Sequence, residues 1–197
     1  MNLSSKLLRI CTGVQAAAII AISMPVSTSY AAAPDPNWHV VKTQYKTDDY
    51  VIAGYEAKDF GISANGRTDV TEKIQTALDE LYKIGGGTLF LPAGRYVVKG
   101  TLKIPQGVIL AGDWQSPDEN NGKAAGTILM AYSGRGENDI NDNYDSETEN
   151  MPFITLEPNA SIKGINIWYP EQAPDNIVPY PTTIRMYDQV PAGRVFC

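Results

Sequence analysis

The chain has 197 residues, 43% of them hydrophobic, and a formal net charge of −6. This length and composition suit one globular domain with enough apolar side chains for a continuous core. The acidic balance argues against nucleic acid as a partner, and it opposes tight binding of a polyanion unless a cation intervenes.

Residues 1–33 have the features of a secretory signal peptide. Lys6 and Arg9 give a positive start, residues 10–24 are mostly apolar, and an alanine run closes the segment at 31–33. The apolar run is shorter than the ~20 residues that span a bilayer, so we expect cleavage and no membrane anchor. The mature protein is then secreted, either extracellular or periplasmic. Cleavage leaves Cys197 as the only cysteine and excludes an internal disulfide.

Residues 34–58 are polar and aromatic, and we expect them to form an extended lead-in that packs along the strands that follow. The chain's only histidine, His39, lies in this segment. A catalytic histidine needs an orienting partner and a site around it, so we expect His39 to be exposed or locally bonded.

The next stretch predicts a turn region, a helix and a helix stop. Residues 59–68 are rich in Gly and Asn and indicate turns. Residues 69–84 have helical periodicity, with Asp69 as the expected N-cap and Glu72 three residues later, as in a capping box. Gly85, Gly86 and Gly87 end the helix, because glycine adopts the left-handed conformation at low cost.

Short apolar runs separated by Gly, Pro and Asn predict strands through the rest of the chain. Two polar loops, 112–126 and 133–150, interrupt the series. The expected strands are 88–91, 96–98, 101–104, 108–111, 127–132, 153–156, 162–168 and 182–186.

One block of motifs resembles a known family. The motifs are Asp59-Phe60-Gly61, Asn65-Gly66, Thr68-Asp69, Ile74-Gln75, Ala77-Leu78, the glycine run and Pro92-x-Gly94-x-Tyr96. Together they resemble the N-terminal signature of pectate-lyase-superfamily and polygalacturonase-related proteins (glycoside hydrolase family 28). Val70 and Lys73 depart from that pattern at positions that tolerate the change. The competing interpretation is an ordinary α/β helix–turn–strand unit.

The resemblance implies an all-β fold, a right-handed parallel β-helix whose first coils follow an N-terminal capping α-helix. In such a fold each coil buries its apolar face only by stacking on its neighbours. We expect Leu89, Ile109 and Ile165 to lie in one inner column. Residues 59–197 would then be the N-terminal part of a β-helix domain that is truncated, because no C-terminal cap is recognisable. A small complete domain that dimerises through its open end is the alternative.

Three carboxyl groups at strand exits are the catalytic candidates that the chain offers. An inverting hydrolase needs two carboxyl groups about 6.5–9.5 Å apart, and residues on stacked coils meet that spacing. Asp113, Glu157 and Glu171 occupy such exits. Solvated loop carboxylates are the competing interpretation for each. The family's own catalytic aspartates match no position here, so none is transferred.

A metal site and a sugar-binding surface complete the candidates. Asp139, Asp145 and Glu147 alternate with asparagines in a pattern reminiscent of a calcium loop, although the mid-loop glycine is missing. Calcium is therefore the candidate cofactor, and a flexible acidic loop is the alternative. Aromatic faces suit sugar rings and a guanidinium suits a uronate. The substrate-binding candidates are Trp114, Trp168, Tyr169 and Arg185.

The function implied by the resemblance is that of a secreted carbohydrate-active protein that cleaves a pectin-like or other polyuronide polysaccharide by hydrolysis or β-elimination. A non-catalytic, glycan-binding β-helix of the tailspike kind is the second reading. An inactive truncated product is the third. The acidic charge argues against nucleic acid as a partner in all three readings, and none of them needs a membrane after signal cleavage.

Overall fold

The computed structural model describes residues 33–47, 49–120, 123, 125–136 and 151–186. This part of the chain is mostly β-structure with one α-helix. Residues 1–32 of the expected signal peptide lie outside the described residues. No described helix is both long enough and apolar enough to cross a membrane. The elements are β1 (His39–Val40), β2 (Ile52–Ala53), β3 (Tyr55–Glu56), η1 (Ala57–Phe60), β4 (Asn65–Asp69), α1 (Thr71–Lys83), β5 (Gly87–Leu91), β6 (Gly94–Val98), β7 (Leu102–Ile104), β8 (Val108–Gly112), β9 (Trp114–Gln115), η2 (Pro117–Asn120), β10 (Ala125–Ala131), β11 (Ile154–Leu156), β12 (Ser161–Lys163), β13 (Ile165–Trp168) and β14 (Ile184–Met186).

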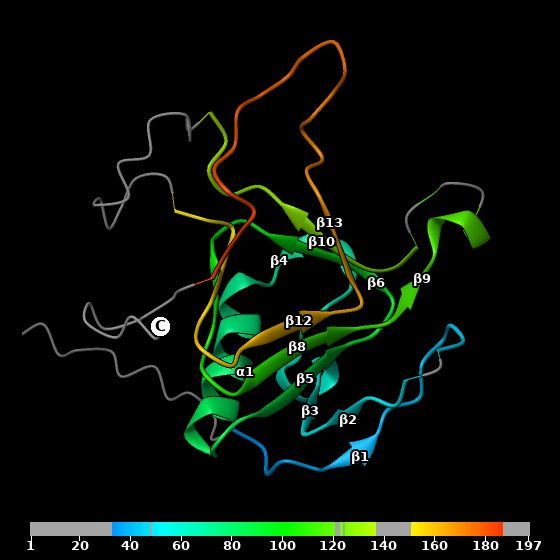
Figure 1. Cartoon of the computed structure of the whole chain (residues 1–197), viewed down its shortest axis with the longest axis vertical. Helices are drawn as coiled ribbons and strands as arrows, with labels where there is room; N and C mark the ends of the chain where they lie inside the picture. The colour runs from blue at the N-terminus through cyan, green and yellow to red at the C-terminus, as the bar shows by residue number, and fades with distance from the viewer. Residues whose placement is uncertain (1–32, 48, 121–122, 124, 137–150, 187–197) are drawn as a thin grey trace, which may run out of the picture. The chain divides into compact units, whose positions relative to one another are not determined.

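Most strands belong to three parallel sheets, which the chain visits in a repeating order. Figure 1 labels the strands of the first two of these sheets. The first sheet has the order β3-β5-β8-β12, the second β4-β6-β10-β13 and the third β7-β11-β14. After β5, β6 and β7, the chain returns to the first sheet with β8, and it repeats the cycle through β10 and β11 and again through β12, β13 and β14. Among the described residues, antiparallel pairing joins β1 to β2 and β9 to β10, and one isolated antiparallel bridge joins Ala173 to Asn176.

Parallel pairing aligns equivalent apolar residues in rows. In the first sheet Leu89 lies beside Leu110, and in the second Tyr96 lies beside Leu129. These four side chains are almost fully buried and share one core cluster with residues of the third sheet. Because the side chains of this cluster come from strands of all three sheets, the core forms only when the three sheets are assembled.

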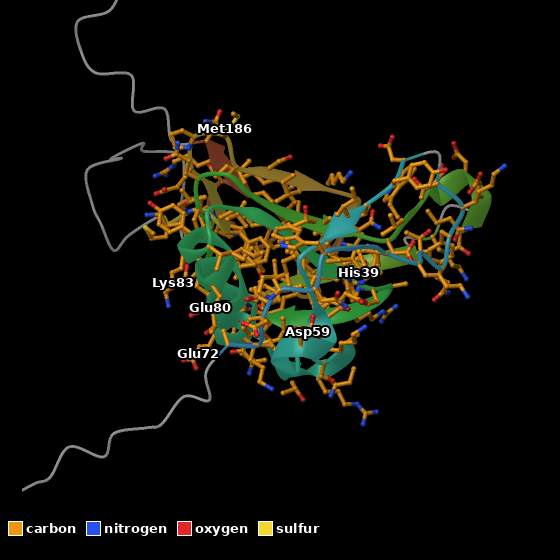
Figure 2. All side chains as sticks on the ribbon, turned by 90° about the horizontal axis from the view of Figure 1, so that it is seen from below. His39, Asp59, Glu72, Glu80, Lys83 and Met186 are labelled. Atoms are coloured by element: carbon orange, nitrogen blue, oxygen red, sulfur yellow. The ribbon has the colours of Figure 1, made fainter. Side chains whose placement is uncertain are left out.

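Helix α1 covers part of this core, as its periodicity predicts. Its buried side chains are Ile74, Ala77, Leu78 and Leu81, and the helix packs against β5, β7 and β8. Its charged side chains, including Glu72, Glu80 and Lys83, point away from the sheets (Figure 2).

The expected cap of α1 is wrong in detail. The helix begins at Thr71, so Val70 occupies the N-cap position. The apolar side chain of Val70 makes no capping hydrogen bond. Asp69 instead accepts bonds from the Thr71 amide at 3.0 Å and the Thr71 hydroxyl at 2.6 Å. A capping box does occur, but on η1, where Glu56 and Asp59 are the pair.

Two other expectations need correction. The turn region 59–68 ends in a strand, β4, which pairs with β6 although it has no buried residue of its own. The expected strand 162–168 is two strands, β12 and β13, which belong to different sheets. Gly164 separates them with a φ of 66°, a left-handed conformation in which the chain turns from one sheet to the next.

Ile109 does not lie in the inner column with Leu89. Register pairs Leu89 with Leu110, so Ile109, one residue earlier on β8, points to the opposite face. There it packs against a second apolar cluster on the outside of the first sheet. Ile165, by contrast, does pack against the inner core. The outer cluster consists of Val41, Val51, Ala53, Phe90 and Ala111.

The outer cluster explains how residues 34–58, the expected lead-in, are held. Val41, Val51 and Ala53 of the lead-in cover Phe90 and Ala111 of the sheet. The lead-in up to Ala53 therefore lies over the first sheet, whereas β3 at its end is a strand of that sheet. The tip of the lead-in, residues 43–47 and 49–51, reaches the end of β8.

Candidate functional site

A pocket of about 450 Å³ lies where the lead-in tip meets two turns between the first and second sheets. One wall comes from the tip and includes Thr43, Lys46 and Asp49. The other comes from residues 112–114, after β8, and residues 163–165, between β12 and β13. The volume falls within the ~300–1,000 Å³ typical of small-ligand sites.

Asp113 connects the two walls of this pocket. Its side chain is 3% exposed, and its carboxylate accepts hydrogen bonds from the backbone amides of Gln44 at 2.5 Å and Tyr45 at 3.3 Å. The Asp113 amide donates to the Thr127 hydroxyl at 2.9 Å. That hydroxyl in turn donates to the Leu91 carbonyl at 2.6 Å. Asp113, a catalytic candidate, thus holds the lead-in tip on the sheets.

Two glycines let the backbone close the base of the pocket. Gly112 and Gly164 lie on successive turns, and a Cβ on either would stand 2.5 Å from the carbonyl oxygen of the other. Any side chain would force these turns apart, so both positions require glycine. The close approach fixes the separation of the turns that carry Asp113 and Lys163.

The other two catalytic candidates lie in different surroundings. Glu157 pairs with Lys103 at 2.6 Å. Glu171 pairs with Arg135 at 3.1 Å and accepts a bond from the Tyr180 hydroxyl at 3.0 Å. Burial, together with this bond, raises the pKa of Tyr180 to about 12. Asp113, Glu157 and Glu171 share no bonding partner among the described residues, so these contacts do not assemble them into an acid–base pair.

The substrate-binding candidates divide between two places. Trp114 lines the pocket on β9 and is 49% exposed. Trp168 is 41% exposed, whereas Ile165 and Ile167 of the same strand pack against the inner core. The Arg95 guanidinium lies 5.4 Å from the centre of the Trp168 ring, a cation–π contact.

Tyr169 and Arg185 lie away from the pocket lining. The Tyr169 ring packs against Tyr180, with ring centres 4.6 Å apart, and its hydroxyl bonds Thr183 at 2.9 Å. Arg185 is partly buried on β14, in register with Thr155 of β11. Tyr169 therefore joins the packing around residues 169–183.

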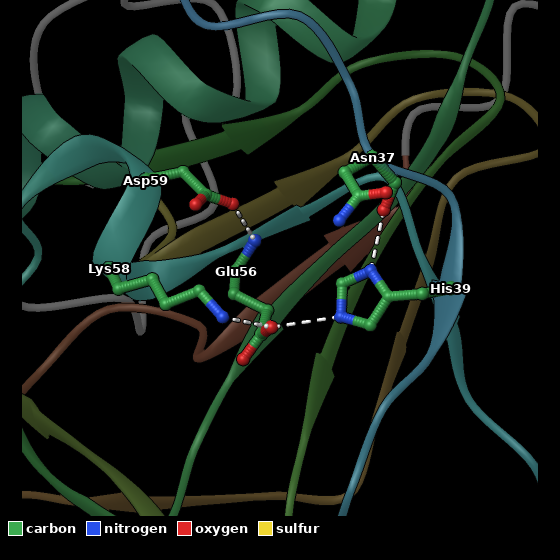
Figure 3. Close-up of polar contacts among 5 residues, drawn as sticks. All are labelled: Asn37, His39, Glu56, Lys58 and Asp59. Atoms are coloured by element: carbon green, nitrogen blue, oxygen red, sulfur yellow. Dashed lines mark hydrogen bonds and ion pairs between the residues drawn. The ribbon is translucent and has the colours of Figure 1, made fainter.

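His39 ties the base of the lead-in to the first sheet (Figure 3). Its Nε2 lies 2.9 Å from a carboxylate oxygen of Glu56, which also accepts a bond from Lys58 at 2.7 Å. Its Nδ1 lies 2.5 Å from the Asn37 carbonyl oxygen. The bond to Asn37, followed by the bond to Glu56, raises the pKa of His39. Burial raises the pKa of Glu56, but the bonds from Lys58 and His39 outweigh it and lower that pKa overall.

The calcium candidates Asp139, Asp145 and Glu147 lie outside the described residues. Within the described ranges, no group of three or more His, Cys, Asp or Glu side chains is placed to hold a metal ion.

Sequence reasoning missed both lysines of the pocket. Lys46 lies in the lead-in and Lys163 at the end of β12, far apart in the chain. An exposed lysine carries no sequence signal of its own, since most lysines are exposed. The nearest usable signal was Gly164, whose turn brings Lys163 beside Gly112.

The described part of the chain thus consists of parallel sheets around a shared core, with a pocket at a turn between two of them. Residues 55–176, more than half of the chain, match the family described as Rhamnogalacturonase A/epimerase, pectate lyase-like, and the chain belongs to this family. The resemblance inferred from its motifs is thereby confirmed.

Curated relatives include three proteins with different described roles. Alginate lyase 7 of Azotobacter vinelandii is 45% identical over 56 residues, 28% of this chain and 6% of the relative. Mannuronan C5-epimerase AlgE1 of the same organism is 39% identical over 93 residues, 41% of this chain and 7% of the relative. The tail spike protein of Shigella phage Sf6 is 35% identical over 134 residues, 64% of this chain and 19% of the relative. The matches thus span less than a fifth of each relative's length.

Proposed function

We propose that this chain folds as a right-handed parallel β-helix and acts on a polysaccharide outside the cytoplasm. The repeating visit to three parallel sheets supports the fold, because stacked coils of three strands each produce this order. The observation that carries the function is the pocket beside Trp114 in a chain of the pectate lyase-like family. Its indole offers a flat apolar face of the kind that sugar rings pack against.

The proposed reaction is cleavage of a polyuronide-like polysaccharide by hydrolysis or β-elimination. Relatives whose names describe an alginate lyase and a mannuronan epimerase support an acidic polysaccharide. Export follows from the signal peptide expected at 1–33, and N-terminal sequencing of exported protein should begin at Pro34. A mature protein that retains Met1 would contradict export by this route.

A panel of polysaccharides tests the proposed activity. Purified protein is incubated with mannuronan, pectin and a neutral glucan, with and without added calcium. We expect new reducing ends, together with unsaturated uronates if the reaction is elimination, from an acidic polymer only. Proton nuclear magnetic resonance spectra of the polymer would detect epimerisation, which is a change of configuration at C5 of a uronate. Absence of both binding and turnover across the panel would contradict the proposal.

Binding without catalysis is the second candidate function. The tail spike match, which covers 64% of this chain, favours it. So do the contacts of Asp113, Glu157 and Glu171, each of which is engaged with a different structural partner. Retention of a polysaccharide with no new chain ends would support this function over cleavage.

A further inference from the structure

The pocket carries two lysines from opposite walls. Lys46 comes from the lead-in tip and Lys163 from the end of β12. Both are exposed, and no ion pair within 4.0 Å joins either ammonium group to another described residue. Two cations in one pocket of an acidic protein repel each other mildly and attract an anion. This arrangement stands out against the chain's net charge of −6.

The acidic groups of the pocket offset these lysines only in part. Asp113 is buried, and both of its carboxylate oxygens accept backbone hydrogen bonds. Asp49 also lines the pocket, is exposed and opposes an incoming anion. Lys46 and Lys163 are therefore the cationic groups that the pocket offers a ligand, and the Asp49 carboxylate opposes them.

Trp114 supplies an apolar face in the same pocket. Its backbone pairs with Gly126 of β10, where a Cβ would stand 2.0 Å from the Asp113 carbonyl oxygen. The position of Trp114 is therefore set by the sheet. The other two tryptophans are engaged elsewhere, since Trp168 contacts Arg95 and Trp38 packs over Gly54 and Gly87.

We propose that this pocket binds a single carboxylate-bearing sugar residue, with its carboxylate between Lys46 and Lys163 and its ring against Trp114. The inference rests on the proposed function, and it assigns recognition of the sugar carboxylate to Lys46 and Lys163. The lead-in is then half of the binding site, and Asp113 is a positioning residue that holds it in place.

Binding measurements on the full chain test this assignment. The probes are a short mannuronate oligomer, the same oligomer with its carboxyl groups reduced to alcohols, and a sulfated neutral oligomer of equal length. We expect the acidic oligomer to bind about tenfold more tightly than the reduced one at low salt. K46A and K163A should each lose about three- to tenfold in affinity for the acidic oligomer and little for the reduced one.

Matched controls come from the chain itself. Lys42 is an exposed lysine of the same lead-in, and Lys123 lies in the turn before β10; neither lines the pocket. K42A and K123A should stay within about twofold of the wild type. D49N should change affinity in the opposite direction and tighten binding of the acidic oligomer. Protection of Lys46 and Lys163, but not Lys42 and Lys123, from acetylation by bound oligomer gives a readout that needs no variant.

The possible outcomes separate this inference from the proposed function. Equal affinity for acidic and reduced oligomers, or unchanged affinity in K46A and K163A, would overturn the inference while binding itself survives. A sulfated oligomer that binds as tightly as the mannuronate would overturn the assignment to a carboxylate. A failure to bind any polysaccharide in the panel would instead contradict the proposed function.

Discussion

At the scale of single residues, both ring nitrogens of His39 face a hydrogen-bond acceptor. Its ring faces the Asn37 carbonyl and the Glu56 carboxylate. Neutral imidazole has one N–H, so only the imidazolium can donate to both. The ion pair is complete where Glu56 is ionised and His39 is protonated, between the lowered pKa of Glu56 and the raised pKa of His39.

The pH dependence of stability follows with a definite sign. A raised pKa in the folded state contributes stability fully below the unfolded-state pKa of about 6.5, and this contribution is lost as pH rises through the folded-state pKa. H39Q has no titrating ring, so its deficit in unfolding free energy should shrink across that window. Urea denaturation of the wild type and of H39Q, from about pH 5 to about pH 9, measures this difference in unfolding free energy. A deficit that does not change with pH would contradict the imidazolium assignment.

Asp113 makes a second prediction at this scale. D113N should destabilise the docked lead-in by about 1–3 kcal/mol, because an amide accepts through one oxygen only and the carboxylate bonds two amides. Hydrogen exchange at Gln44 and Tyr45 should quicken more than exchange in α1. E157Q, which removes the charge of a surface ion pair with Lys103, serves as control and should leave these two amides unchanged. Equal protection in D113N and the wild type would show that other contacts hold the lead-in.

At the scale of elements, the turn between β12 and β13 depends on its glycine. G164A should lower stability by about 1–3 kcal/mol from the strained backbone, with a further loss from the contact with the Gly112 carbonyl. G136A is the matched control: its φ of 85° is also left-handed, but nothing lies within 4 Å of the added Cβ. Thermal melts of both variants separate conformational strain from steric contact. Equal losses in the two would show that the contact contributes nothing.

Elements with an apolar pattern were predicted from sequence, and elements without one were not. Strand β8 matches the expected 108–111 almost to the residue, because Val108 and Leu110 are apolar between turn-forming neighbours. Strand β4 was missed because Asn65, Gly66 and Asp69 give no apolar signal. It forms because β6 offers it a partner, which is a tertiary cause that local sequence does not record.

The candidate site was less predictable than the fold for a related reason. Trp114 and Asp113 drew attention by residue type, and both do line the pocket. What the sequence did not show is that residues 43–47 and 49–51 would cover the end of β8, because that contact depends on scattered apolar residues, Val41 and Val51. The direction of Ile109 was mistaken because a run of apolar residues does not reveal which of its two faces is inward.

At the scale of the whole molecule, the rows of paired residues stay aligned although the chain between them varies in length. Leu89 pairs with Leu110, and Leu110 pairs with Ile162 after an interval more than twice as long. The longer interval does not shift the register of the paired strands. A search for distant kin by a constant repeat period would therefore fail with this architecture. Comparing the rows of paired residues while allowing the connecting segments to vary in length would identify relatives whose overall lengths differ.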